Sequence, residues 1–300
     1  MGTLAEMLST PLGVIEWFVY LLAAVMFVID LHLMNSPKTA RKGNMVSAIG
    51  MIFAVAMAFI VLFAGEISNG FKHSVAVVVL IVGIVIGAVA GVVSAKKVKM
   101  TDMPQLVSVF NTVGGGAAAL VALNDILTSA ETPSIVVLIT AGLGIMIGSV
   151  TFSGSLIAAG KLQGIKWVKR LSLPGKGFWN ILFVVLTVAS FVMLCVQPNQ
   201  RLLWSVLTTV FALCYGLVFV IPIGGADMPV VISVLNACTG TAVAMSGLAI
   251  NNIALIVAGA LVGAAGVTLS IAMSKAMNRP LLSVLAGGFG GSNSAAGAGE

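Results

Sequence analysis

The chain has 300 residues, of which 59% are hydrophobic and 8% are charged. A soluble domain carries about 25% charged residues, so water cannot be the main solvent of this chain, and an integral membrane protein is expected. The net charge of +6 would suggest nucleic acid or acidic partners for a soluble protein. In a membrane protein it reflects topology instead, and we expect no nucleic-acid partner.

Nine apolar runs, separated by polar breaks, are each long enough to cross a bilayer about 30 Å thick. They cover residues 12–33, 44–64, 74–95, 104–128, 134–160, 178–196, 201–221, 228–248 and 251–274. The sequence therefore predicts an all-α membrane protein with nine transmembrane helices, within a transmembrane domain at residues 1–280. The three cysteines, Cys195, Cys214 and Cys238, all lie inside these runs, which argues against a disulfide framework or a metal cluster.

The basic residues lie almost entirely on one side of these spans. With alternating crossings, all of the 15 Lys and Arg residues except Lys72 and Arg201 fall on the side of the C-terminal tail. Loops rich in Lys and Arg remain in the cytoplasm. We therefore expect a cytoplasmic C-terminus and an external N-terminus.

Glycines recur at the spacing of helix contacts in three of the spans. They are Gly83, Gly87 and Gly91 in the third span, Gly144 and Gly148 in the fifth, and Gly259, Gly263 and Gly266 in the ninth. Association of helices in lipid depends on close approach of their backbones, which small residues about four apart permit. We expect these glycines to lie at helix-packing contacts.

One string of ten residues occurs twice, at the starts of the fourth and eighth spans. It runs from Asp102 to Asn111 in the first copy and from Asp227 to Asn236 in the second, with Met-Pro after each Asp. An even number of crossings separates the copies, so both enter the membrane from the cytoplasmic side. The sequence therefore predicts a parallel internal repeat of spans 4–5 and 8–9.

The acid of each copy has two interpretations. Asp102 and Asp227 each stand where a carboxylate can cap the first turn of a helix that has Pro near its start. Capping is the better account of Asp102, although this residue could also mark a second cytoplasmic entrance, or mouth, of a pathway into the membrane. Asp227 follows Gly224 and Gly225 in a loop without basic residues, and for it capping and a role in docking or proton entry stay equally open.

The amide of each copy lies nine residues beyond the acid, roughly 13.5 Å deeper at a helical rise of 1.5 Å per residue. Polar groups at that depth are functional candidates, although buried amides also bond neighbouring helices. Recurrence in both copies favours a polar pathway lined by Asn111 and Asn236, whose side chains would hold water or relay protons. An amide cannot titrate, so it can orient a proton carrier without being one.

Residues 281–300 are rich in Gly, Ser and Ala, a composition typical of a flexible linker. On the cytoplasmic side of the membrane, such a linker is expected to lead toward a further domain.

Four segments resemble the membrane part of the proton-translocating NAD(P) transhydrogenase beta subunit family. They are residues 38–44, 95–104, 224–231 and 275–290. The resemblance runs from about residue 12 to 290, and the family implies nine spans. It implies an enzyme of the bacterial cytoplasmic (inner) membrane that couples inward proton translocation to hydride transfer from NADH to NADP⁺. This chain would supply the proton channel, with no catalytic residue, metal or bound cofactor of its own.

The resemblance also implies cofactors and partners. The complete enzyme would use NAD(H) and NADP(H), and the linker would lead to the NADP(H)-binding domain. Alpha-type transhydrogenase subunits would bring an NAD(H) domain and further membrane helices, in a dimer of alpha-beta units.

Site residues follow from the same resemblance. Asn236 would line the proton channel, while Asp227 with Arg279 would face the NADP(H)-binding domain and couple its redox state to proton access. Many family members have a titrating His at the position of Asn111. We therefore expect a histidine on a membrane helix of the alpha-type partner to supply the titrating group.

Two other classes of protein stay open. A secondary transporter or channel with a parallel helix-pair repeat predicts substrate-dependent flux by this chain alone. A purely structural membrane anchor predicts that Asn111→Ala and Asn236→Ala are silent in proton transport.

Overall fold

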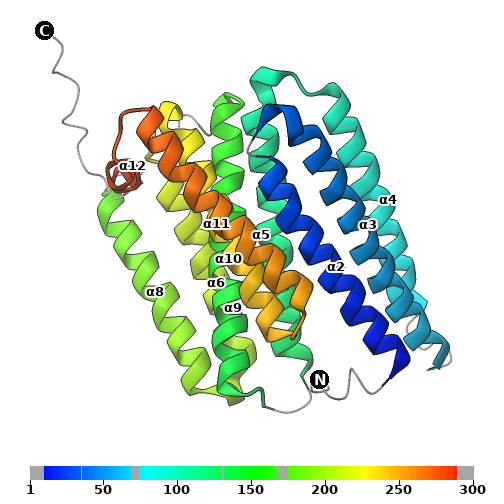
Figure 1. The fold of residues 1–300 in the computed structure, drawn as a ribbon. Helices are drawn as coiled ribbons and strands as arrows, with labels where there is room; N and C mark the ends of the chain where they lie inside the picture. Colours follow the sequence, from blue (N-terminus) through cyan, green and yellow to red (C-terminus); the bar gives the residue numbers. More distant parts are fainter. Residues whose placement is uncertain are drawn as a thin grey trace, which may run out of the picture. The chain divides into compact units, whose positions relative to one another are not determined.

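The structure is a computed structural model that describes residues 10–34, 36–68, 74–129, 132–166, 168 and 175–288. These residues are mainly helical and contain no strand, and nine of their helices are long and apolar enough to cross a membrane (Figure 1). The predicted fold class, all-α with nine spans, is confirmed. The chain divides into two compact units, Met1–Lys99 and Met100–Glu300.

The first unit contains α2 (Pro11–Leu33), α3 (Pro37–Ser68) and α4 (Ser74–Lys97). The α2 helix begins with a cap, because the backbone N–H of Gly13 donates to Thr10 Oγ1 at 3.1 Å. Helix α3 begins at Pro37, seven residues before the predicted span. Proline is favourable at the first position of a helix, because the N–H that it lacks would have no partner within the helix. Gly50 lets α3 approach α2 closely, because a Cβ there would lie 3.1 Å from Met26 Cβ.

The second unit holds seven helices and three short 3₁₀ turns. The helices are α5 (Met103–Thr128), α6 (Ile135–Leu162), α8 (Lys176–Val196), α9 (Arg201–Val220), α10 (Met228–Ala249), α11 (Ile253–Ala276) and α12 (Leu281–Gly288). The 3₁₀ turns η1 (Met100–Asp102), η2 (Pro198–Gln200) and η3 (Gly225–Asp227) directly precede α5, α9 and α10. All six long helices begin and end within a few residues of the predicted spans.

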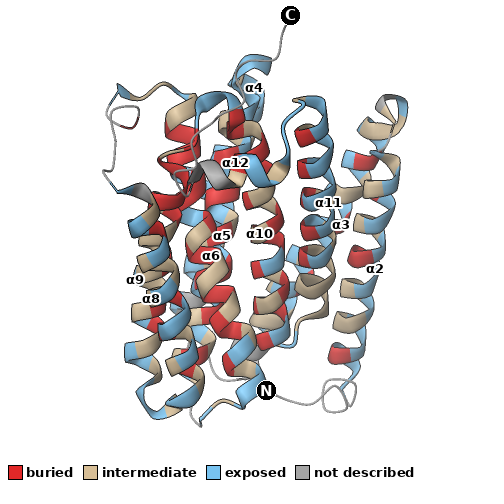
Figure 2. Ribbon diagram, turned by 90° about the vertical axis from the view of Figure 1, so that its left-hand side faces the viewer, coloured by how far each residue is buried: buried red, intermediate tan, exposed pale blue. Residues whose placement is uncertain are grey.

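Helices α6 and α10 form the centre of the second unit. Helix α6 packs on α5, α8, α9 and α10, while α10 also packs on α11 and α5. Their residues are largely buried, as the red segments of Figure 2 show, and this agrees with the apolar sequence of both helices. A cluster that includes Ile157, Val220, Met228 and Val284 fills the core beside the start of α10.

The pairs α5–α6 and α10–α11 make matching contacts. Gly115, Ala119 and Gly148 carry the contact in the first pair, and Gly240, Ala244 and Gly259 carry it in the second. A Cβ on Gly148 would lie 2.7 Å from the carbonyl oxygen of Gly115, and one on Gly259 would lie 2.6 Å from that of Gly240. The residues on α5 and α10 are offset by the 125 residues that separate the two copies of the string. Glycine therefore allows close contact at corresponding places in the two helix pairs, and the parallel repeat itself stays a prediction.

The two glycine series have different surroundings. Gly259, Gly263 and Gly266 lie against the backbone of α10, where larger side chains would collide with it or press on it. A Cβ at Gly83, Gly87 or Gly91 would meet nothing within 4 Å. The helix α4 buries none of its apolar window within the first unit, so the expected packing contact at these three glycines stays a prediction.

The segment predicted to be a linker begins with a helix. Residues Leu281–Gly288 form α12, whose first turn is closed by hydrogen bonds from the N–H groups of Ser283 and Val284 to the carbonyl oxygen of Pro280. The Val284 side chain is buried at the end of the bundle. Residues 289–300, the rest of that segment, lie outside the described residues.

Candidate functional site

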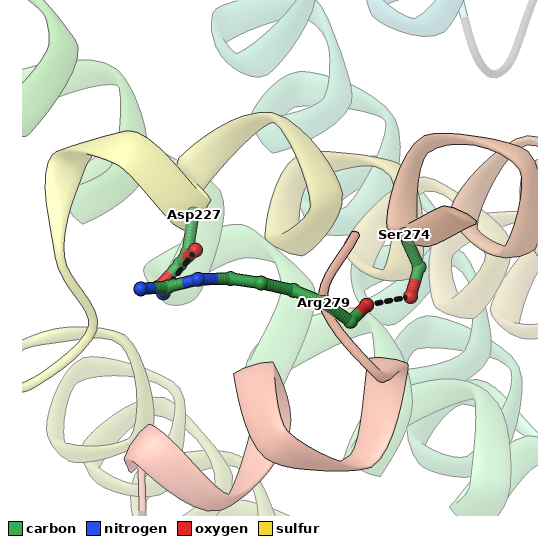
Figure 3. Close-up of polar contacts among 3 residues, drawn as sticks. All are labelled: Asp227, Ser274 and Arg279. Carbon is green, nitrogen blue, oxygen red and sulfur yellow. Dashed lines mark hydrogen bonds and ion pairs between the residues drawn. The ribbon is translucent and has the colours of Figure 1, made fainter. Parts of the chain in front are cut away.

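The second copy of the string begins with an ion pair. Asp227 is buried at the start of α10, and Nη1 of Arg279 donates to its Oδ1 at 2.8 Å and its Oδ2 at 2.6 Å (Figure 3). The Asp227 side chain is 9% exposed, whereas the Arg279 side chain is 44% exposed. The pair thus joins a buried carboxylate to a guanidinium that stays open to its surroundings.

The end of α11 sets the position of Arg279. Asn278 adopts a left-handed conformation with φ of 49°, which Asn tolerates better than most residues. The Arg279 N–H then donates to the Ser274 carbonyl at 3.1 Å, and Ser274 Oγ donates back to the Arg279 carbonyl. This closed helix end aims the long side chain at Asp227, as Figure 3 shows.

Neither acid caps its helix with its side chain. Asp102 and Asp227 occupy the N-cap positions of α5 and α10, but neither carboxylate accepts a backbone N–H of its helix. The capping interpretation is therefore wrong for both. Each helix is preceded by a 3₁₀ turn, which places the acid in a conformation other than the extended one of a typical N-cap.

Within the described part of the second unit, no cation forms an ion pair with the acid of the first copy. Asp102 is exposed, and its Oδ1 accepts only a long hydrogen bond of 3.4 Å from Thr101 Oγ1 among the residues described. Lys96, Lys97 and Lys99 precede it in sequence and belong to the first unit. Within the second unit, Asp102 is thus exposed.

The amide of the first copy is buried and bonded. Asn111 is 6% exposed, and its Nδ2 donates to Ser155 Oγ on α6 at 2.8 Å. Ser108, one turn earlier, donates to the Ser155 carbonyl at 2.7 Å. The Asn111 Oδ1 atom is also buried but has no partner among the described residues. An unpaired oxygen in such a place is suited to hold a water molecule.

The amide of the second copy is less constrained. Asn236 is half-buried and makes no hydrogen bond to the residues described. One turn later, Thr239 is 7% exposed, and its Oγ1 is a second buried oxygen without a partner in the described structure. Its methyl group lies beside Gly114 of α5, because a Cβ on Gly114 would be 3.4 Å from Thr239 Cγ2. Thr239 therefore lies at the same α5–α10 contact as the turn that follows Asn111.

Sequence reasoning overlooked both Thr239 and Lys161. Thr239 follows Asn236 by three residues, which is the spacing of one helical face, and this was the available signal. Lys161 was counted only as a charge that sets topology. In the structure its Nζ donates to backbone carbonyls at the end of α9, a role that no sequence pattern indicates.

An apolar cavity of about 260 Å³ lies between α6, α8, α9 and α10. Its wall includes Met146, Val184, Tyr215 and Cys238, and neither Asn111 nor Asn236 contributes to it. Cys195, Cys214 and Cys238 are all free thiols. The cavity offers almost no polar surface to a proton or to a nucleotide phosphate.

Comparison with known proteins shows the family of this chain. Residues 16–300 match the family model described as NAD(P) transhydrogenase beta subunit. Over 288 residues the chain is 38% identical to NAD(P) transhydrogenase subunit beta of Rhodospirillum rubrum, a match that covers 93% of this chain and 59% of the relative. The same subunit from a named strain of that organism gives the same figures. The chain thus spans about three-fifths of the length of these curated relatives, and it belongs to the NAD(P) transhydrogenase beta subunit family.

Proposed function

We propose that this chain is the proton-conducting membrane part of an NAD(P) transhydrogenase, in which inward proton translocation is coupled to hydride transfer from NADH to NADP⁺. The observation that carries the proposal is the Asp227–Arg279 pair at the mouth of α10, nine residues before Asn236. A buried carboxylate held by one exposed cation can change its pairing when a neighbouring domain moves. Such a pair is suited to couple a cytoplasmic event to access along α10.

Asn111 and Asn236 are proposed to line the proton pathway. The two unpartnered oxygens, Asn111 Oδ1 and Thr239 Oγ1, would hold water between α5 and α10. Amide and hydroxyl groups orient water but do not change charge near neutral pH, so the pathway needs a titrating group. A histidine on a membrane helix of an alpha-type partner would supply it, and Asp102 would mark a second, solvated mouth.

The apolar cavity between α6, α8, α9 and α10 does not suit a dinucleotide, because its wall carries no group that could neutralise a pyrophosphate. NAD(H) and NADP(H) are proposed to bind in other parts of the complete enzyme. The NADP(H)-binding domain would follow residues 281–300, and the NAD(H) domain would belong to the alpha-type subunit.

The proposed assembly is a dimer of alpha-beta units in the bacterial cytoplasmic (inner) membrane. The tail and the Asp227 mouth would face the cytoplasm, and the N-terminus would lie outside. Membership of the family disfavours the alternative of a secondary transporter or channel, which would need substrate-dependent flux by this chain alone.

The test is to reconstitute the complete complex in sealed vesicles and to follow proton movement with a pH-sensitive dye while NADH reduces NADP⁺. Proton movement that requires both nucleotides is expected, and its absence would overturn the proposal. Each histidine in the partner's membrane helices is then replaced by Asn, one at a time. We expect one replacement to abolish proton movement, whereas undiminished pumping in every variant would exclude a partner histidine as the titrating group.

A further inference from the structure

Lys161, in the last turn of α6, reaches across to the end of a different helix. Its Nζ donates to the carbonyl oxygens of Val220 at 3.2 Å and Ile223 at 2.8 Å, and also to that of Ile221. The last four carbonyls of a helix have no partner within it, and a cation there also interacts favourably with the helix dipole. Lys161 therefore ties the C-terminus of α9 to the C-terminal end of α6.

The segment next to this contact is the turn that carries Asp227. Gly224 and Gly225 are exposed, and a Cβ on either would meet nothing within 4 Å. These two glycines thus have little packing of their own, whereas Ile223 before them and Met228 after them are buried in the core. Two cations also contact the turn, Lys161 through the Ile223 carbonyl and Arg279 through the Asp227 carboxylate.

The same helix also carries the partner of the buried amide. Ser155 lies six residues before Lys161, or about 9 Å along α6 at 1.5 Å per residue. Its Oγ accepts the hydrogen bond from Asn111, so α6 contacts the cytoplasmic turn at one end and the amide further in. Gly148 and Gly154 let neighbouring helices press closely on α6, and a packed helix of this kind moves as one body.

We propose that Lys161 is a positioning residue that couples the turn of Asp227 to the proton pathway by tying this turn to α6. The inference rests on the proposed function and adds a residue to it. A rearrangement of the Asp227–Arg279 pair would shift the turn, and Lys161 would pass that shift along α6 to Ser155 and Asn111. Lys161 touches neither nucleotide nor the transferred proton.

The test compares Lys161→Met with Lys161→Arg and Lys166→Met in the complete reconstituted complex. Met keeps the apolar stem and removes the donors, Arg keeps donors and charge, and Lys166 is an exposed lysine five residues on. Hydride transfer is measured in detergent, and the number of protons moved per hydride is measured in sealed vesicles. Because coupling energies along packed elements are modest, we expect Lys161→Met to lower the proton-to-hydride ratio about tenfold. Lys161→Arg should restore most of the ratio, and Lys166→Met should leave it unchanged.

A purely structural role predicts a different result. Lys161→Met would then lower the melting temperature and reduce hydride transfer and proton movement in proportion, with an unchanged ratio, and this outcome would overturn the inference. If the wild-type complex moves no protons during hydride transfer, the proposed function fails, which is a distinct result.

A second variant keeps the inference testable if Lys161→Met does not assemble. One glycine inserted between Gly224 and Gly225 lengthens the turn in open space and leaves both cations in place. We expect this insertion to lower the proton-to-hydride ratio with little change in melting temperature. Gly224→Ala, which adds one methyl group in the same open space, is its control. An insertion variant with a wild-type ratio would show that the turn does not need its tie to α6.

Discussion

The two copies of the repeated string make their polar side-chain contacts at opposite ends, the first at its Asn and the second at its Asp. In the first copy, Asp102 is exposed and unpaired while Asn111 is buried and bonded to Ser155. In the second, Asp227 is buried and paired with Arg279, whereas Asn236 makes no hydrogen bond to the described residues. Similar sequences therefore give an exposed acid with a hydrogen-bonded amide in the first copy. In the second copy they give a buried, ion-paired acid and an amide without a hydrogen bond to the described residues.

The cause of this difference lies in the second helix of each pair. Ser108 and Ser233 stand at the same place in the two copies and donate to the carbonyls of Ser155 and Gly266, respectively. Ser155 and Gly266 are thus equivalent positions. Asn111 finds a hydroxyl there, but in the second pair the equivalent residue has no side chain. Repetition of the string alone does not repeat the site.

The same equivalence explains the two mouths. Arg279 lies 13 residues after Gly266, and the residue 13 positions after Ser155 is Val168, which is buried in the core beside Val220. The first pair therefore has an apolar packing residue where the second has a cation. Among the described residues of the second unit, Asp227 therefore has an ion pair and Asp102 has none.

The largest expected effect comes from breaking one helix pair. Gly259→Leu places a side chain into the backbone of Gly240 and Ala244, and overpacking of this kind costs about 3 kcal/mol or more because backbone cannot yield as side chains can. We expect little assembled protein, and a sharply lower melting temperature in detergent for what does assemble. Gly87→Leu is the matched control, since a Cβ there meets nothing within 4 Å. Equal melting temperatures for the two variants would contradict the close contact of α10 with α11.

The next effect separates the two mouths. Asp227→Asn removes the charge that faces Arg279, and losing one partner of a buried pair costs roughly 3–5 kcal/mol. Arg279 is 44% exposed, so water offsets part of this loss, and about 1–2 kcal/mol of unfolding free energy is expected to be lost. We also expect the coupled rate to fall about tenfold, because coupling free energies between sites are typically about 1–3 kcal/mol. Asp102→Asn should change that rate less than twofold. The measurement is NADP⁺ reduction by NADH in energised vesicles, and equal losses in both variants would argue that the two mouths are equivalent.

A third comparison separates the two amides by stability. Asn111→Ala loses the bond to Ser155 and leaves a cavity, which should cost about 1–3 kcal/mol of unfolding free energy. Asn236→Ala loses no hydrogen bond to the described residues and should cost less than about 1 kcal/mol. Both variants are expected to lower proton movement at least fivefold. Melting temperature and dye-reported proton uptake, measured on the same preparations, check this, and a greater loss of stability for Asn236→Ala would reverse the assignment.

The nine spans could be predicted because their signal is local. A run of about 20 apolar residues has few alternatives in a chain that must satisfy its backbone inside lipid, and the observed helices follow the runs closely. Resemblance to the family implied that Asp227 and Arg279 face the same domain, but their ion pair was not predicted, since 52 residues separate the partners. Local patterns carry no signal for a contact of that range.

What could not be predicted depends on which neighbour each side chain meets. The capping interpretation failed because the 3₁₀ turns before α5 and α10 change the backbone at Asp102 and Asp227. The glycines of α4 carry the same pattern as those of α11, yet no close neighbour is present in the described structure. The role of Lys161 depends on backbone carbonyls about 60 residues away. Every residue has such a carbonyl, so the sequence does not indicate which ones a lysine will bind.

The smallest expected effect tests how alike the two pairs remain at their shared position. Ser108 Oγ donates to Ser155 O at 2.7 Å, and Ser233 Oγ donates to Gly266 O at 3.1 Å. The two hydroxyls thus make equivalent hydrogen bonds of different length. Ser108→Ala and Ser233→Ala should each cost about 1 kcal/mol of unfolding free energy, with the larger loss at Ser108 because its bond is shorter.

The two losses should add in the double variant, since the serines belong to different helix pairs and share no partner. Unfolding in detergent at several temperatures measures each loss, and Thr241→Val serves as control because its hydroxyl bonds only within α10. Near-additive losses would support two structurally equivalent pairs. A loss of stability at only one serine would mean that Ser155 and Gly266 are not equivalent positions, although the two ten-residue strings are similar. The explanation for the lack of a hydrogen bond from Asn236 to the described residues would then fail.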